Sequence, residues 1–182
     1  AWHLAREALL LIIRLAGQVP SRRSRLSSNV SRLMSDHALR LVPQELQFQP
    51  ELAAALSAEA LLRAFFPEAQ QVQSKYFESV SFIDAGENWE GVRCSACGAD
   101  AESWWSDSMS AAAEVGFSSL ITKAPCCGTT VQLSELNYGW PVAFGRFALE
   151  VLNPNASSLT HEQLTQLSAL LGAQVVMVHA RI

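Results

Sequence analysis

The chain is 182 residues long, enough for one domain and little more. Hydrophobic residues make up 49% of it and charged residues 16%, which excludes a disordered chain. Four cysteines in this length are too few for a disulfide scaffold, and the formal net charge is −4.

The charge is distributed unevenly along the chain, and its sign changes at Met34. Residues 1–33 carry six arginines and one glutamate (net +5), whereas residues 34–182 carry net −9. Three interpretations of the basic extension 1–33 stay open: a wrongly extended reading frame or expression remnant ahead of Met34, an added helix packed on the domain, or a targeting segment. Its apolar run, residues 8–13, is too short to span a membrane. We therefore expect a basic extension, residues 1–33, and one domain, residues 34–182.

The first half of that domain predicts a helix and a hairpin. Pro50 is favourable at a helix start, an apolar stripe follows at helical spacing, and Pro67 ends it. Residues 76–83 alternate and are rich in aromatic and β-branched side chains, which predicts a strand. Residues 84–88 form a predicted turn, and residues 89–93 are the expected hairpin partner of that strand.

The second half predicts a β-α-β unit. Thr160 to Gln163 form a capping box ahead of an apolar stripe, which predicts a helix. Strands are expected on either side of it, so residues 144–182 imply two parallel strands. The predicted elements of this half are a helix at 103–115, short strands at 120–123 and 129–133, long strands at 144–152 and 175–182, and the capped helix. The expected class is α+β, with a mixed, mostly antiparallel sheet.

All four cysteines lie within residues 94–128. Cys94 and Cys97 belong to a CxxCG turn, which points two thiolates at one metal, and its glycine takes the positive φ that closes the turn. Cys126 and Cys127 are adjacent and are followed by Gly128. Aligning the two Cys-Gly steps places Cys127 opposite Cys97, so the second turn is irregular.

Three ligand sets are compatible with this pattern. Thiolates at such spacing favour Zn²⁺, and the first expectation is a structural site formed by Cys94, Cys97, Cys126 and Cys127. The second keeps three cysteines and adds a histidine or water, the open position that catalytic zinc requires. The third has no metal and leaves four buried or disulfide-paired thiols. A cytoplasmic setting, which we expect, disfavours the disulfides.

Residues 94–128, about a fifth of the chain, resemble a zinc ribbon or zinc knuckle. On the peptides FIDAGENWEGVRCSACGA, APCCG and YGWPVAFGRF, residues 76–182 are similar to small bacterial proteins of uncharacterised function. The first resemblance implies an embedded zinc-ribbon-like module. The second implies no activity.

Other candidate residues have a structural interpretation beside the functional one. The tryptophans near the cysteines are compatible with core packing as well as with binding. Adjacent helical residues point 100° apart, so one of Trp104 and Trp105 is expected to be exposed or at the edge of the core. Three carboxylates around the turn suit an acidic patch, a general base or a solvated loop: Asp84, Glu87 and Glu90. His161 and His179 have no ligand spacing to a cysteine.

These observations favour a binding protein over an enzyme. The chain has no GxGxxG, P-loop, HExxH or GxSxG pattern. Net −9 on residues 34–182 would repel nucleic acid and suits a basic protein partner. We expect a small zinc protein that acts through protein–protein interaction, for example as an immunity- or antitoxin-like inhibitor. The alternative is a metal-dependent hydrolase with an open zinc site.

Overall fold

The computed structural model describes residues 36–156 and 158–182. The predictions for residues 1–33 lie outside these residues.

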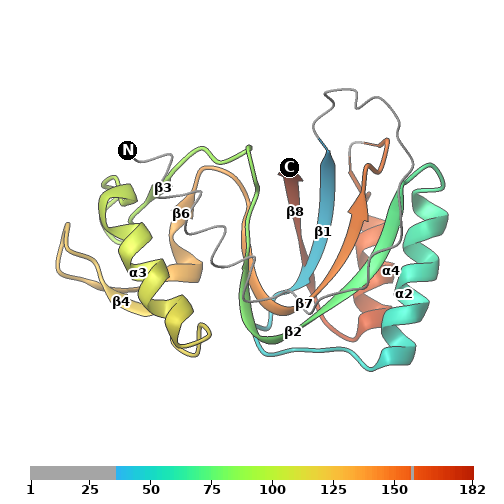
Figure 1. Cartoon of the computed structure of the whole chain (residues 1–182), viewed down its shortest axis with the longest axis horizontal. Coiled ribbons are helices and arrows are strands. Elements are labelled where there is room, and N and C mark those ends of the chain that lie inside the picture. The colour runs from blue at the N-terminus through green and yellow to red at the C-terminus, as the bar shows by residue number, and fades with distance from the viewer. Residues whose placement is uncertain (1–35, 157) are drawn as a thin grey trace, which may run out of the picture.

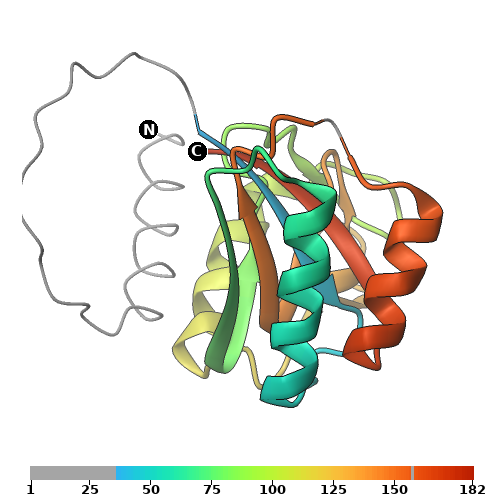
Figure 2. The ribbon, with the colours of Figure 1, turned by 90° about the vertical axis from the view of Figure 1, so that its right-hand side faces the viewer.

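A four-stranded sheet is the centre of the fold (Figure 1). Its strands are β1 (His37–Pro43), β2 (Gln71–Ile83), β7 (Ala143–Leu152) and β8 (Val175–Arg181), in the order β2-β7-β1-β8. All three neighbouring pairs are antiparallel. Helices α2 (Leu52–Phe65) and α4 (His161–Leu171) lie side by side on one face of this sheet (Figure 2).

The order of these elements is β-α-β-β-α-β, the split β-α-β arrangement of ferredoxin-like folds. It confirms the α+β class and the C-terminal β-α-β unit, here β7-α4-β8. The two strands of that unit are parallel but are not neighbours, because β1 pairs with both of them. The sequence patterns predict no strand at His37–Pro43, the segment that forms β1 between β7 and β8.

The sheet and the two helices enclose a hydrophobic core. Phe147, Leu149 and Val151 alternate along β7, and each of them is fully buried against the helices. Leu62 of α2 and Leu167 of α4 meet them from the other side. The capping box that the sequence predicts at Thr160 is present: the Thr160 side chain accepts a hydrogen bond from the Gln163 amide, and the Thr160 amide donates one to Gln163 Oε1.

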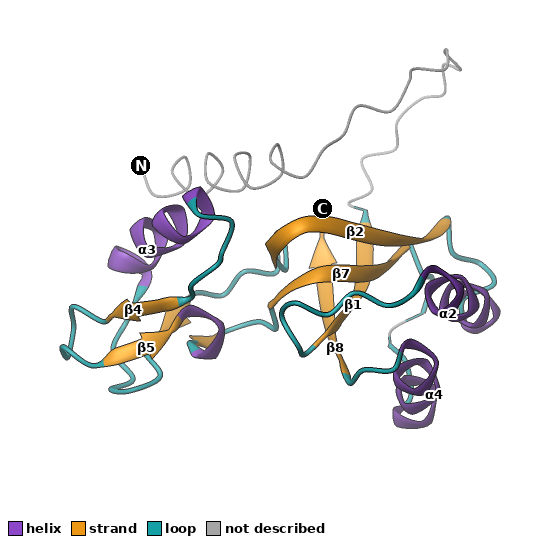
Figure 3. Cartoon of the chain, turned by 90° about the horizontal axis from the view of Figure 1, so that it is seen from below, coloured by secondary structure: helices purple, strands orange, loops and turns teal. Residues whose placement is uncertain are grey.

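Residues 84–142, between β2 and β7, form an inserted module. It lies on the side of the sheet away from α2 and α4 (Figure 3). Its elements are β3 (Val92–Arg93), α3 (Glu102–Glu114), β4 (Ile121–Lys123), β5 (Thr130–Gln132), the 3-10 helix η1 (Leu133–Glu135) and β6 (Asn137–Tyr138). Strand β4 pairs with β5 and β3 pairs with β6.

Two expectations for this module are wrong. Residues 89–93 do not return along β2; instead Val92 and Arg93 pair with Tyr138 and Asn137. Trp104 and Trp105 are both buried, at 9% and 2% exposure. Both belong to one hydrophobic cluster, which includes residues of β2, β5 and β7, so α3 is covered over more than one side.

No helix within the described residues is long and apolar enough to cross a membrane.

Candidate metal centre

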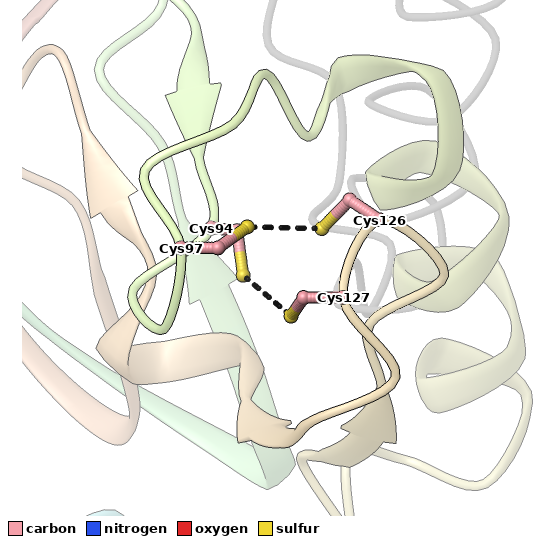
Figure 4. A group of neighbouring side chains, drawn as sticks. All are labelled: Cys94, Cys97, Cys126 and Cys127. Carbon is pink, nitrogen blue, oxygen red and sulfur yellow. Dashed lines mark hydrogen bonds between the residues drawn. The ribbon is translucent and has the colours of Figure 1, made fainter.

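The four cysteines lie on two facing turns of the inserted module. Cys94 and Cys97 belong to the turn after β3, and Cys126 and Cys127 to the turn between β4 and β5. All four side chains point toward one another across the gap between the turns (Figure 4). The structure thus brings together all of the metal ligands that the sequence predicts.

The two turns have the same backbone hydrogen bonds. In the first, the Gly98 amide donates to the Cys94 carbonyl at 2.9 Å and the Cys94 amide donates to the Ala99 carbonyl at 2.9 Å. In the second, the Gly128 amide donates to the Ala124 carbonyl at 2.7 Å and the Ala124 amide donates to the Thr129 carbonyl at 2.8 Å. Both glycines have φ +74°, the left-handed conformation that closes each turn. We call these turns the first and second knuckle.

The sulfur positions fit one tetrahedral ion. Four sulfurs about 2.3 Å from a zinc ion lie about 3.8 Å from one another. Here the Cys94 and Cys127 sulfurs are 3.9 Å apart, the Cys97 and Cys126 sulfurs are 3.5 Å apart, and all four lie within 4.8 Å of one another. The cluster could therefore hold a metal ion.

The four cysteines differ in exposure. Cys94 is fully buried and belongs to the hydrophobic cluster of the module, whereas Cys97, Cys126 and Cys127 are exposed. The aromatic side chains around Trp105 pack in the same cluster. Trp105 packs against Trp89 with ring centroids 4.7 Å apart and ring planes tilted by 38°, and it donates a hydrogen bond to the Tyr138 hydroxyl at 3.1 Å. Trp89, Trp104 and Trp105 thus pack in the hydrophobic cluster that also contains Cys94, while Trp140 donates a hydrogen bond to the His179 carbonyl of β8 at 2.9 Å.

The adjacent cysteines Cys126 and Cys127 have different pKa values because their surroundings differ. Hydrogen bonds from the side chain and backbone of Thr129 lower the pKa of Cys127 to about 7. Desolvation and hydrogen bonds among the four thiols raise the pKa of Cys126 to about 12. A soft metal cation that binds these thiols displaces their protons, because the thiolate is the form that ligates a metal.

One basic residue precedes each knuckle. Arg93 and Lys123 occupy equivalent positions, immediately before Cys94 and Ala124, and they are the only Lys or Arg among residues 84–142. Arg93 Nη1 donates to the Gly98 carbonyl at 3.3 Å, so it lies along its own knuckle. Four thiolates around a divalent ion would carry a net double negative charge, the sign opposite to that of these two residues.

The other candidate groups lie apart from the cysteines. Among the described residues, the metal-compatible cluster consists of the four cysteines, with no histidine or carboxylate. Asp84 is nearly buried and its Oδ1 accepts a hydrogen bond from the Gly86 amide at 2.6 Å, while Glu87 pairs with Arg181. His161 lies exposed at the start of α4. Burial lowers the pKa of His179, which lies on β8.

Comparison with known proteins gives no relative: no protein-family model, curated protein or solved structure matches the chain significantly.

Proposed function

We propose that this protein binds one Zn²⁺ through Cys94, Cys97, Cys126 and Cys127, and that the ion has a structural role. The observation that carries this proposal is the convergence of four sulfurs, all within 4.8 Å of one another, from two turns of one hydrogen-bond pattern. Thiolate softness selects zinc over magnesium or calcium, and it also admits iron. The zinc-ribbon resemblance of residues 94–128 supports the choice of zinc.

The ion would join two strand pairs whose strands are short. Strands β3, β4, β5 and β6 are only two or three residues long, so their pairing contributes little stability by itself. A metal bound by both knuckles fixes the β4–β5 hairpin against the β3–β6 pair. Binding of zinc to such a site contributes directly to the folding free energy.

Four thiolates also argue against the hydrolase alternative. Catalytic zinc needs three protein ligands and one position open to water. The four sulfurs fill a tetrahedral shell, and no histidine or carboxylate of the described residues joins them. We therefore propose a binding protein rather than an enzyme.

We further propose that the protein acts on a basic protein partner, as an immunity- or antitoxin-like inhibitor would. Residues 84–142 contain eight acidic and two basic residues. Asp107 and Glu114 are exposed and lie seven residues apart along α3, which places them on one side of the helix, and Asp100 is exposed just before its start. Such a charge distribution steers a basic partner and repels nucleic acid.

Metal analysis tests the zinc proposal directly. Protein purified without added metal should contain about one zinc per chain by elemental analysis. Cys94→Ser should lose it, while Ser95→Ala, a change at an exposed position of the same knuckle, should retain it. Less than about half a zinc per chain, with all four thiols reduced and unmodified, would refute the proposal.

The partner proposal needs a separate test. Cross-linking followed by mass spectrometry in the source cells should identify one partner with an excess of Lys and Arg. Reversing charge at Asp107 and Glu114 should weaken its binding in purified form, and raising the salt concentration should do the same. Binding that is equally strong after charge reversal would contradict a basic partner.

A further inference from the structure

Cys126 is in an unusual place for a ligand. The shared hydrogen-bond pattern makes Ala124 the counterpart of Cys94 and Cys127 the counterpart of Cys97. The second knuckle therefore has an alanine, fully buried, where the first knuckle has its buried cysteine. Its missing sulfur is supplied instead by Cys126, two residues further along the chain and exposed.

This displacement creates an exposed sulfur pair between the knuckles. The Cys97 and Cys126 sulfurs are 3.5 Å apart, and both residues are exposed (Figure 4). The other short pair, Cys94 with Cys127, contains a sulfur that the hydrophobic cluster buries. Cys126 and Cys127 are adjacent, and a disulfide between neighbours in a trans chain is strained.

We infer that Cys97 and Cys126 are a modification site, at which peroxide forms a disulfide and releases the metal. One thiolate attacks hydrogen peroxide, which gives a sulfenic acid and one hydroxide. The other thiolate then attacks the sulfenic sulfur, forms the S–S bond and expels a second hydroxide. Together the two thiolates lose two electrons, the peroxide gains two, and protons from the buffer convert the two hydroxides to water.

The geometry and the charge favour this reaction at this pair. The sulfurs need to approach by about 1.5 Å to reach disulfide bonding distance. The cationic side chains of Arg93 and Lys123 stand immediately before the two knuckles. Exposed cysteines are more easily oxidised than buried ones, and Cys97 and Cys126 are both exposed.

Disulfide formation then releases zinc. Cys94 and Cys127 remain, and two thiolates do not hold zinc as four do. Each disulfide therefore frees one ion, and the Cys97–Cys126 bond replaces the ion as the link between the two knuckles. This inference rests on the proposed zinc site.

The experiment uses the full chain in its zinc-bound form. Hydrogen peroxide is added in small steps, released zinc is measured with a colorimetric chelator, and the disulfide is mapped by mass spectrometry of proteolytic fragments. We expect one zinc released per disulfide, a Cys97–Cys126 link, and recovery of zinc binding after reduction with a phosphine. A different link, or zinc loss without any disulfide, would overturn the inference.

The double variant Ala124→Cys/Cys126→Ser is the matched comparison. It keeps four cysteines but moves the exposed ligand to the buried position. Zinc release by peroxide should be at least about tenfold slower than in the natural chain. An equal rate would overturn the inference. If this variant binds no zinc, the disulfide map of the natural chain decides the question alone. Absence of zinc from the reduced natural protein would instead refute the zinc proposal.

Discussion

Ala124 stands in the second knuckle where Cys94 stands in the first. Each residue accepts a hydrogen bond from the glycine four positions later and donates one to the carbonyl five positions later. Each is fully buried. The two knuckles are thus one backbone motif used twice, and they differ in which positions carry sulfur.

This equivalence predicts that the lost ligand can be restored. Cys126→Ser removes one sulfur and should lower zinc affinity at least about tenfold. Adding Ala124→Cys to that variant should return zinc to about one ion per chain, because the new sulfur takes the place that Cys94 has in the first knuckle. Competition with a chelator measures both affinities. A double variant no better than Cys126→Ser would show that the knuckles are not equivalent.

The four single serine variants should differ in a defined order. Cys94→Ser and Cys97→Ser should lose more zinc and more thermal stability than either change in the adjacent pair, and Cys126→Ser should lose the least. Cys94 is the buried ligand, whereas Cys126 is exposed and displaced from the usual position. Zinc content and melting temperature of the four proteins check the order. Unchanged zinc in Cys94→Ser would contradict the site.

Much of this site could be predicted from local sequence. CxxCG is a turn motif whose two ligands are close in the chain, and the second Cys-Gly step fixes the alignment of Cys127 with Cys97. The position of Cys126 could not be derived in that way, because adjacent residues of an extended segment point to opposite sides. It is the turn from Ala124 to Gly128 that directs its sulfur to the cluster.

The order of the strands could not be predicted, because it depends on pairs far apart in the chain. Leu39 pairs with Val151 on one side and with His179 on the other, and no local pattern contains this information. The same reason explains the error at Val92, whose partner Tyr138 lies at the far end of the module. The helices, by contrast, were found at nearly their observed bounds, because their stripes, prolines and caps are local.

Glu150 shows a further consequence of long-range pairing. The sequence places it on the polar side of β7, yet it is buried and receives hydrogen bonds from Arg40 at 2.9 Å and Gln73 at 3.0 Å, with Lys75 at 2.7 Å. Desolvation would raise the pKa of Glu150, but its bonds with Lys75 and Arg40 prevail and lower it to about 2.

The pH dependence of stability follows from this shift. An unfolded glutamate has a pKa near 4.3, so the ionised Glu150 stabilises the fold above that pH by about 3 kcal/mol, and the contribution is lost as pH falls toward 2. Glu150→Gln should lower the free energy of unfolding by about 3 kcal/mol at pH 7 and flatten its dependence between pH 5 and 2. Urea unfolding at several pH values measures this. Glu68→Gln, at an exposed position, is the control and should change little.

Gly86 should be intolerant of any side chain. It has φ +60° and forms a bridge with Arg181, and a Cβ at this position would collide with the Arg181 carbonyl. The adjacent Glu87 amide donates to that carbonyl at 2.8 Å, so the loop ties the module to β8. Gly86→Ala should cost about 2 to 4 kcal/mol in unfolding free energy. Gly172→Ala has a similar φ of +78° with no atom within 4 Å and should cost about 1 kcal/mol.

The last prediction concerns the basic extension. We expect residues 1–33 to be dispensable for the fold, because the charge changes sign at Met34 and the sheet is complete from Asp36 onward. The Asp36 carbonyl accepts a hydrogen bond from the Ile182 amide at 2.8 Å, and His37 begins the strand that pairs with both β7 and β8. A chain that begins at Met34 contains both residues.

Such a shortened chain should melt within about 5 °C of the full chain, which for this size corresponds to about 2 kcal/mol or less. It should also hold the same amount of zinc, since all four cysteines lie beyond Met34. A loss of 10 °C or more, on the order of several kcal/mol, would show instead that Leu9, Ile12 and Ile13 pack on the domain. Arg→Gln changes confined to residues 1–33 then distinguish the two modes of attachment: loss of stability on removing arginines indicates electrostatic docking on the acidic domain, and no loss indicates apolar packing.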